Sequence, residues 1–113
     1  MAYDEDLANR IRELLSDEGG VTEMTMFGGL AFLLGGNMAV AASGQGGLLV
    51  RVDPVDGEEL ISSAGASPMV MRGREMTGWL RVEAQAVRNK RQLQGWVRRG
   101  VAYARSLPAK AER

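Results

Sequence analysis

The stretch Met24–Ala41, MTMFGGLAFLLGGNMAVA, is the most apolar part of the 113-residue chain, and glycines divide it twice. Glycines at 28–29 break or bulge the run, and residues 35–37 (Gly-Gly-Asn) supply positive φ angles that favour a hairpin turn. Residues 30–34 are apolar on both faces, as in an interior strand. We therefore expect this stretch to form the central hairpin of a sheet.

The remaining elements follow from periodicity and from start and stop signals. Leu7, Ile11, Leu14 and Leu15 make one helical stripe behind Asp4, a plausible N-cap. Glycines at 19–20 are expected to end that helix. The expected order is helix 4–18; strands 22–27, 30–34, 38–43 and 48–52; helix 54–63, loop 65–68, strands 69–72 and 76–83, and helix 86–107.

This order predicts an α+β fold with two layers, in which three helices cover a mostly antiparallel sheet of five to six strands. Asp53-Pro54 and the acid at Asp56 favour the start of the second helix. Gly100, inside the last helix, is expected to allow close approach to the sheet or to another helix. Residues 1–113 are expected to form a single domain.

The composition excludes several kinds of chemistry. The chain contains no cysteine and no histidine, which removes thiolates, disulfides and the usual metal ligand and general base. We expect no enzyme, and no catalytic residue, metal site or cofactor. The acidic N-terminus does not resemble a signal peptide, and the longest apolar run falls short of the ~20 residues of a membrane span. A cytoplasmic protein without membrane contact is expected.

The net charge of zero conceals an asymmetry: residues 1–87 carry a balance of −7 and residues 88–113 a balance of +7. The basic end could contact nucleic acid. It could equally meet an acidic surface within the chain or on a second chain, which we favour. The candidate nucleic-acid contacts are Arg88, Lys90, Arg91, Arg98 and Arg99.

Three other patterns have a structural and a functional interpretation. The carboxylates of residues 53–59 could hold a cation, but helix capping explains them better. The glycine-rich segments 35–37 and 44–47 lack the lysine of a phosphate loop and are expected to be turns. The methionines that fall in or beside strands favour core packing, with an adaptable partner surface as the alternative.

Several motifs together resemble the N-terminal domain of the TfoX/Sxy family of bacterial competence regulators. They are the Met-Phe-Gly-Gly block at Met26, Phe27, Gly28 and Gly29, the Gly-Arg-x-Met-x-Gly-Trp block that includes Gly73, Gly78 and Trp79, and a Trp96-Val97-x-x-Gly100 segment. The resemblance covers nearly the whole chain. It implies the secretion-chaperone-like two-layer fold, with those seven block residues in structural roles.

The resemblance also shapes the expected function. Longer family members act as transcriptional co-regulators and carry a C-terminal helical domain; ending at Arg113, this chain is expected to be a stand-alone N-terminal domain. We expect a non-enzymatic regulatory module that acts through protein contacts, as a homodimer and with an unidentified protein. The alternative is a nucleic-acid-binding accessory protein that uses the basic last helix.

Overall fold

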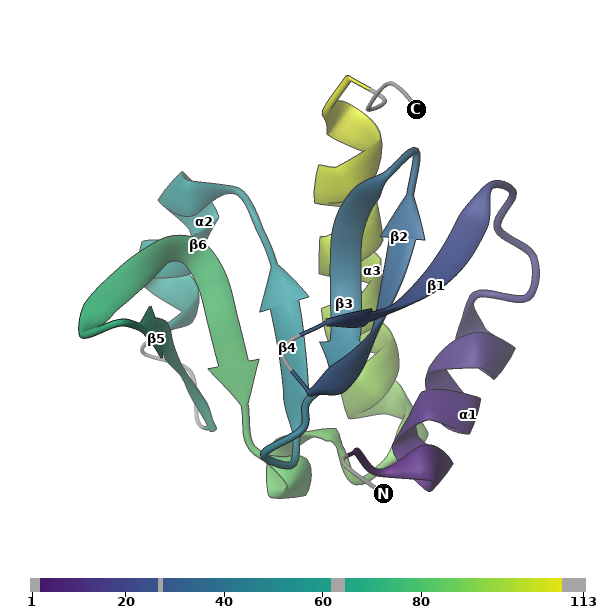
Figure 1. Ribbon diagram of the computed structural model, residues 1–113, viewed down its shortest axis with the longest axis horizontal. Helices are drawn as coiled ribbons and strands as arrows, with labels where there is room; N and C mark the ends of the chain where they lie inside the picture. Colours follow the sequence, from purple (N-terminus) through teal and green to yellow (C-terminus); the bar gives the residue numbers. More distant parts are fainter. Residues whose placement is uncertain (1–2, 27, 62–64, 109–113) are drawn as a thin grey trace.

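The computed structural model describes residues 3–26, 28–61 and 65–108, and Figure 1 shows their arrangement. The elements are α1 (Glu5–Leu14), β1 (Val21–Met26), β2 (Gly29–Leu34), β3 (Asn37–Ala42), β4 (Leu48–Arg51), α2 (Pro54–Leu60), β5 (Ala66–Met71), β6 (Arg74–Val82), the short 3₁₀ helix η1 (Ala84–Val87) and α3 (Lys90–Ser106). The strands form one antiparallel sheet in the order β1-β2-β3-β4-β6-β5.

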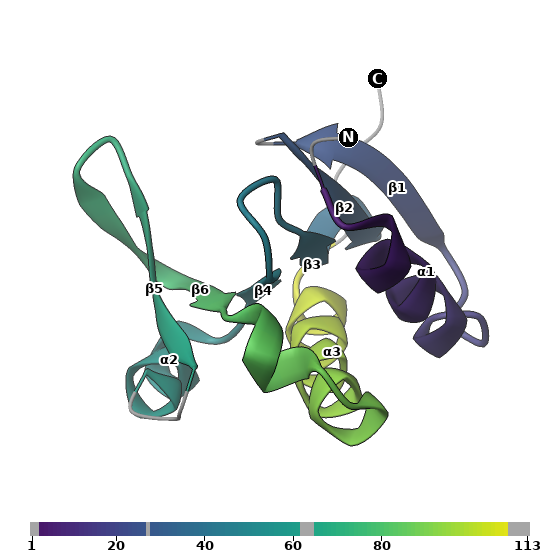
Figure 2. The same cartoon turned by 90° about the horizontal axis from the view of Figure 1, so that it is seen from below.

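The α-helices lie on one face of this sheet, and the sheet curls so that its two ends rise on the other side (Figure 2). The predicted α+β fold with two layers and three α-helices is therefore confirmed, with six strands. None of the helices in the described ranges is long and apolar enough to cross a membrane.

Side-chain caps start the helices where the sequence indicates. The Asp4 carboxylate accepts hydrogen bonds from the backbone N–H groups of Asp6 and Leu7, at 2.9 and 3.2 Å. The Asp53 carboxylate accepts from the N–H of Val55 at 2.9 Å. Both caps satisfy donors that the first helical turn leaves unpaired, as predicted.

Three predicted boundaries are wrong. The first helix ends at Leu14, with its C-cap at Leu15, well before the glycines at 19–20. The expected helix 86–107 is two elements, because Asn89 starts α3 with its own capping box and separates it from η1. The expected loop 65–68 is largely strand, because β5 begins at Ala66 and accommodates Pro68 at the edge of the sheet.

The β2–β3 hairpin confirms the predicted turn with one correction. Gly35 and Gly36 have φ of 60° and 83°, as a two-residue hairpin turn needs. Asn37, however, is the first residue of β3; it is buried, and its amide nitrogen donates to the carbonyl of Pro108 at 3.0 Å. The asparagine therefore ties the hairpin to the chain beyond α3 and is not part of the turn.

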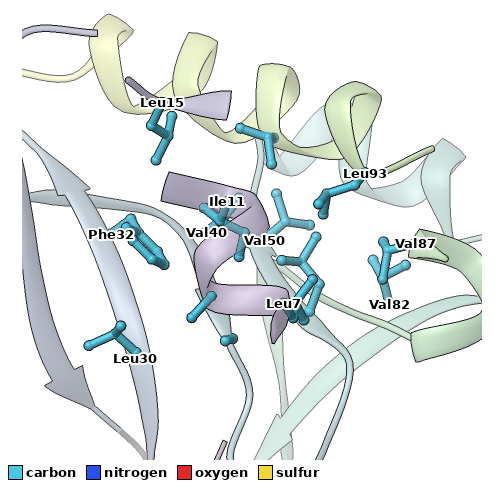
Figure 3. Packing of buried hydrophobic residues seen from close by; sticks show 14 of the residues in the cluster. Leu7, Ile11, Leu15, Leu30, Phe32, Val40, Val50, Val82, Val87 and Leu93 are labelled. Carbon is cyan, nitrogen blue, oxygen red and sulfur yellow. The ribbon is translucent and has the colours of Figure 1, made fainter. Parts of the chain in front are cut away.

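The main core fills the space between the sheet and α1 and α3 (Figure 3). Ile11 of α1, Phe32 of β2 and Val40 of β3 are fully buried there, with Leu93 and Val97 of α3 almost so. Burial of such side chains stabilises a fold by about 1.5–3 kcal/mol each. Trp96 was expected to be buried in the same stripe; it is only partly buried and packs at the border of this core.

Gly100 lets α3 approach the sheet backbone directly. A Cβ atom at this position would lie 2.4 Å from the carbonyl oxygen of Ala39. Ala39 is the additional residue of a bulge, since the β2–β3 register shifts between Phe32 and Leu33. The expected close approach is confirmed, and it is made to the sheet.

An ion pair joins α1 to the edge strand β1. Arg12 donates from Nε and from a terminal guanidinium nitrogen to the two oxygens of Glu23, at 2.6 and 2.9 Å. The hydrogen bond from Arg12 lowers the pKa of Glu23 below its usual value, against a smaller opposing effect of partial burial. Glu23 is thereby held on the helix side of the sheet.

We expect Gly100→Ala to lower the free energy of unfolding by about 1–2 kcal/mol, although alanine favours helix by about 1 kcal/mol. The added methyl group must displace α3 from the carbonyl of Ala39. Gly95→Ala is the matched control, because Gly95 lies in the same helix, is exposed and has no neighbour within 4 Å. Urea unfolding should show Gly95→Ala raising stability; equal gains in both variants would contradict the close contact.

We expect Glu23→Gln to lower the melting temperature at about pH 7, and this effect to shrink progressively as the pH falls below the usual glutamate pKa of about 4.3. Because the folded-state pKa of Glu23 is depressed, its contribution is present above the unfolded-state pKa and disappears as pH falls through the folded-state value. Scanning calorimetry at several pH values measures the difference. Glu75→Gln is the control, since Glu75 forms no ion pair within the described residues; a pH-independent effect at Glu23 would refute the ion pair.

Candidate functional site

Six methionines gather on the sheet face that the helices leave uncovered. Residues directly opposite each other in neighbouring strands share a face, so Met24 lies beside Ala31, Met38 beside Leu33 and Met69 beside Met76. We call this surface the methionine face. Its members are Met24, Met26, Ala31, Leu33, Met38, Ala41, Leu49, Met69, Met71, Met76 and Trp79.

Exposure on the methionine face rises toward β1 and toward the β5–β6 turn, although Met69 of the edge strand β5 is itself buried. Met38 and Met69 are 3% and 5% exposed. Met26, Met71 and Met76 are partly buried, and Met24 is 52% exposed. The curled sheet explains this gradient, because its ends rise around the centre (Figure 2). Flexible thioether side chains therefore lie at the two borders, where a partner could meet them.

Arginines accompany the apolar side chains on this face. Arg51 is the last residue of β4, and its Cζ atom lies 5.1 Å from the centroid of the Trp79 ring and 5.5 Å from that of Tyr103, a residue of α3, so Arg51 links this face to the helix layer. These cation–π contacts hold Arg51 in place without a carboxylate. Arg81 lies opposite Leu49 and is partly buried, and its side chain makes no hydrogen bond or ion pair within the described part of the chain.

The carboxylates of the strands lie on the opposite side. Glu23 stands opposite Phe32, which belongs to the helix-side core, and Glu75 stands opposite Val70, between two residues of the methionine face. Strand alternation therefore places acids and arginines on different faces. The methionine face is apolar and positively charged.

A hollow of about 400 Å³ adjoins this face between the β3–β4 connection and β5. Its apolar lining includes Leu49, Met69 and Met71. Its positively charged lining residues are Arg72 and Arg81. Arg72 has a φ of 54° in the β5–β6 turn, a backbone conformation uncommon for a residue with a side chain. The arrangement can accept a negatively charged group that is attached to an apolar one.

The predicted nucleic-acid contacts lie along and just before α3. Arg88, Lys90, Arg91, Arg98 and Arg99 are all exposed, and none of them forms an ion pair among residues 3–26, 28–61 and 65–108. The Cζ atom of Arg99 lies 6.0 Å from the Trp96 ring centroid.

Among the described residues, one ion pair joins the acidic and basic parts of the chain. Arg105 of α3 pairs with Glu18, which follows α1. Arg10 of α1 also donates to the backbone carbonyls of Val87 and Arg88, at 2.9 and 3.0 Å. The charges were expected to meet within one chain or between two; the ion pair seen here lies within the chain and involves Arg105, whereas the five predicted contact residues form no ion pair in the described ranges.

The glycines of the family motifs have structural roles. A Cβ atom at Gly29 would lie 2.2 Å from the carbonyl oxygen of Ala42, and one at Gly78 would lie 2.9 Å from that of Val52. Gly28 and Gly73 have φ of 77° and 78° in hairpin turns. Phe27 lies outside the described residues. The motif glycines therefore maintain turns and close strand packing, whereas Met26, Met76 and Trp79 of the same motifs lie on the methionine face.

The acidic segment 53–59 acts in helix capping through Asp53. Within the described residues, no three aspartate or glutamate side chains come together as a metal site would require. Sequence reasoning did not single out Arg51 and Arg81. The alternation of side chains along a strand could have identified them, because it places Arg51 on the same face as Leu49 and Arg81 on the same face as Trp79.

The comparisons with known proteins agree with this fold. No curated protein and no solved structure matches the chain. The model of the TfoX N-terminal domain family matches residues 13–104 of the 113-residue chain. That range includes the sheet, α2, most of α3 and the motif glycines. The family is not a known enzyme family. Its membership suggests a regulatory or competence-related role. The chain belongs to the TfoX N-terminal domain family.

Proposed function

We propose that this protein is a non-enzymatic, cytoplasmic regulatory module that acts through protein contacts, in the manner of a transcription co-regulator. The methionine face is the observation that carries this proposal. It combines flexible apolar side chains with arginines that lack a carboxylate partner among the described residues. Family membership supports the regulatory part.

The chemistry of the face selects the partner. Arg72 and Arg81 line the hollow beside Met69 and Met71, and the strand carboxylates point to the other side of the sheet. Charge complementarity therefore favours a partner segment that carries carboxylates next to apolar side chains. Methionine-rich surfaces suit such segments because their side chains adapt to the shape they meet.

We expect the tagged protein to capture a protein partner that nuclease treatment does not remove. The double variant Arg72→Glu, Arg81→Glu should lose about tenfold in capture, the equivalent of ~1.4 kcal/mol. Quantitative mass spectrometry of the purified material measures the amount of captured partner, and circular dichroism checks that each variant is folded.

The matched control is Arg88→Glu, Lys90→Glu, which makes the same change of charge before and at the start of α3. This control should retain the partner. Equal loss in both double variants, or equal retention in both, would reject the methionine face as the contact surface.

A second candidate is nucleic-acid binding by α3, favoured by the five exposed and unpaired basic side chains described above. Such side chains bind phosphates by releasing counterions, which makes the affinity fall steeply with salt. Trp96 adds no exposed stacking platform, since Arg99 lies over its ring.

If α3 binds nucleic acid, a triple variant should give a weaker gel shift at low salt. This variant combines Arg91→Ala, Arg98→Ala and Arg99→Ala. The slope of log affinity against log salt should fall by about 0.9 for each lost phosphate contact. Arg72→Ala, Arg74→Ala is the control, because both residues lie at the β5–β6 turn. No shift of duplex DNA or RNA by the unaltered protein at low salt would eliminate this candidate.

A further inference from the structure

The two edge strands of the sheet differ in how well they are protected. β5 contains Pro68, which has no N–H to donate, and its register shifts between Pro68 and Met69. Both features hinder the addition of another strand. β1 has neither: its six residues pair with β2 without a register shift, and residues 22–25 are exposed.

An open, regular edge presents unpaired backbone N–H and C=O groups that fit an extended strand. Figure 1 shows β1 at the end of the sheet, beside α1. The exposed residues Thr22, Glu23, Met24 and Thr25 include one charge, and Arg12 already holds that carboxylate on the helix side. Most devices that keep edge strands apart are therefore missing from β1.

We propose that β1 pairs in antiparallel fashion with β1 of a second copy of this chain, around a twofold axis at Met24. The two sheets then form one continuous sheet of twelve strands. This inference rests on the proposed function as an interaction module and gives the homodimer its surface.

The location of the axis follows from strand geometry. Residues that stand opposite each other share a face, so a twofold axis perpendicular to the sheet must pass beside a residue and cannot pass between two. An axis at Glu23 would place that carboxylate against its own copy, which is unfavourable. An axis at Met24 puts Glu23 opposite Thr25 of the second copy and Met24 opposite its own equivalent.

The same axis makes the two methionine faces continuous. Met24 lies on that face, opposite Ala31, and is 52% exposed in the isolated chain. Its equivalent in the second copy would cover it, and Met26 would stand opposite Thr22 of that copy. The net charge of zero adds no overall repulsion between copies. The most exposed methionine among the described residues thereby gains an apolar neighbour.

The absence of cysteine from the sequence provides a direct test. In the variant Met24→Cys, the two new thiols would stand opposite each other with Cα atoms about 4.5–5.5 Å apart. This separation suits a disulfide, which needs roughly 4.4–6.8 Å. We expect a disulfide-linked dimer to form under mild oxidation at least tenfold faster than with Val70→Cys, an equally exposed position on the β5 edge.

Glu23→Cys tests the register. Its two copies would lie diagonally, about 7–8 Å apart, and should link poorly. Linking of Val70→Cys as fast as Met24→Cys would indicate random collision and overturn the proposal. Faster linking of Glu23→Cys than of Met24→Cys would overturn the axis at Met24.

The oligomeric state of the cysteine-free protein gives a second measurement. Sedimentation should show a dimer for the unaltered chain and for Val70→Lys, and a monomer for Met24→Lys with an unchanged circular dichroism spectrum. A monomeric unaltered chain at every concentration tested would refute the dimer. That result would leave partner capture by the methionine face intact, since the Arg72 and Arg81 variants lie at the other end of the sheet.

Discussion

The close contact between α3 and the sheet organises the rest of the molecule. Because Gly100 has no side chain, α3 can rest on the carbonyl of Ala39, where the bulge in β3 turns an additional residue toward the helix. This contact places Leu93 and Val97 over the centre of the sheet, and α1 fills the remaining helix-side space with Ile11. The helices therefore cover the apolar side chains on one face of the sheet. On the other face, the side chains of the strands pack against one another.

That division separates two chemistries. On the helix side, acidic and basic side chains form ion pairs: Glu23 pairs with Arg12, and Glu18 pairs with Arg105. On the methionine face, arginines lie among thioethers and Trp79 without a carboxylate from the strands. The TfoX N-terminal domain family suggests a regulatory or competence-related role. We proposed the methionine face as the contact surface for such a role, because it combines flexible thioethers with arginines.

Local signals in the sequence predicted the order of elements well. The aspartates that cap α1 and α2 and the glycines of the β2–β3 turn act over a few residues, so their effect can be seen in the sequence alone. Two boundary errors arose where the signal that we followed was overridden by another feature of the chain or of the sheet. Asn89 interrupts a long apolar periodicity by capping α3, and Pro68 is tolerated in a strand because that strand lies at an edge. The site was harder to foresee, because Arg51 meets Tyr103 from a distant part of the chain and the bulge at Ala39 changes which residues share a face.

The grouping of methionines also decides where an oxidant would act. The protein has no cysteine, so the methionine thioethers are the sulfur groups that an oxidant can attack. The methionines of the described strands share one face of the sheet. Oxidation to the sulfoxide turns an apolar side chain into a polar one and is reversible by dedicated reductases. Among the described methionines it would begin at exposed Met24 and proceed through the partly buried Met26, Met71 and Met76, and it would spare the helix-side core of leucine, isoleucine, valine and phenylalanine. Oxidation would thus alter the proposed contact surface before it reached the helix-side core.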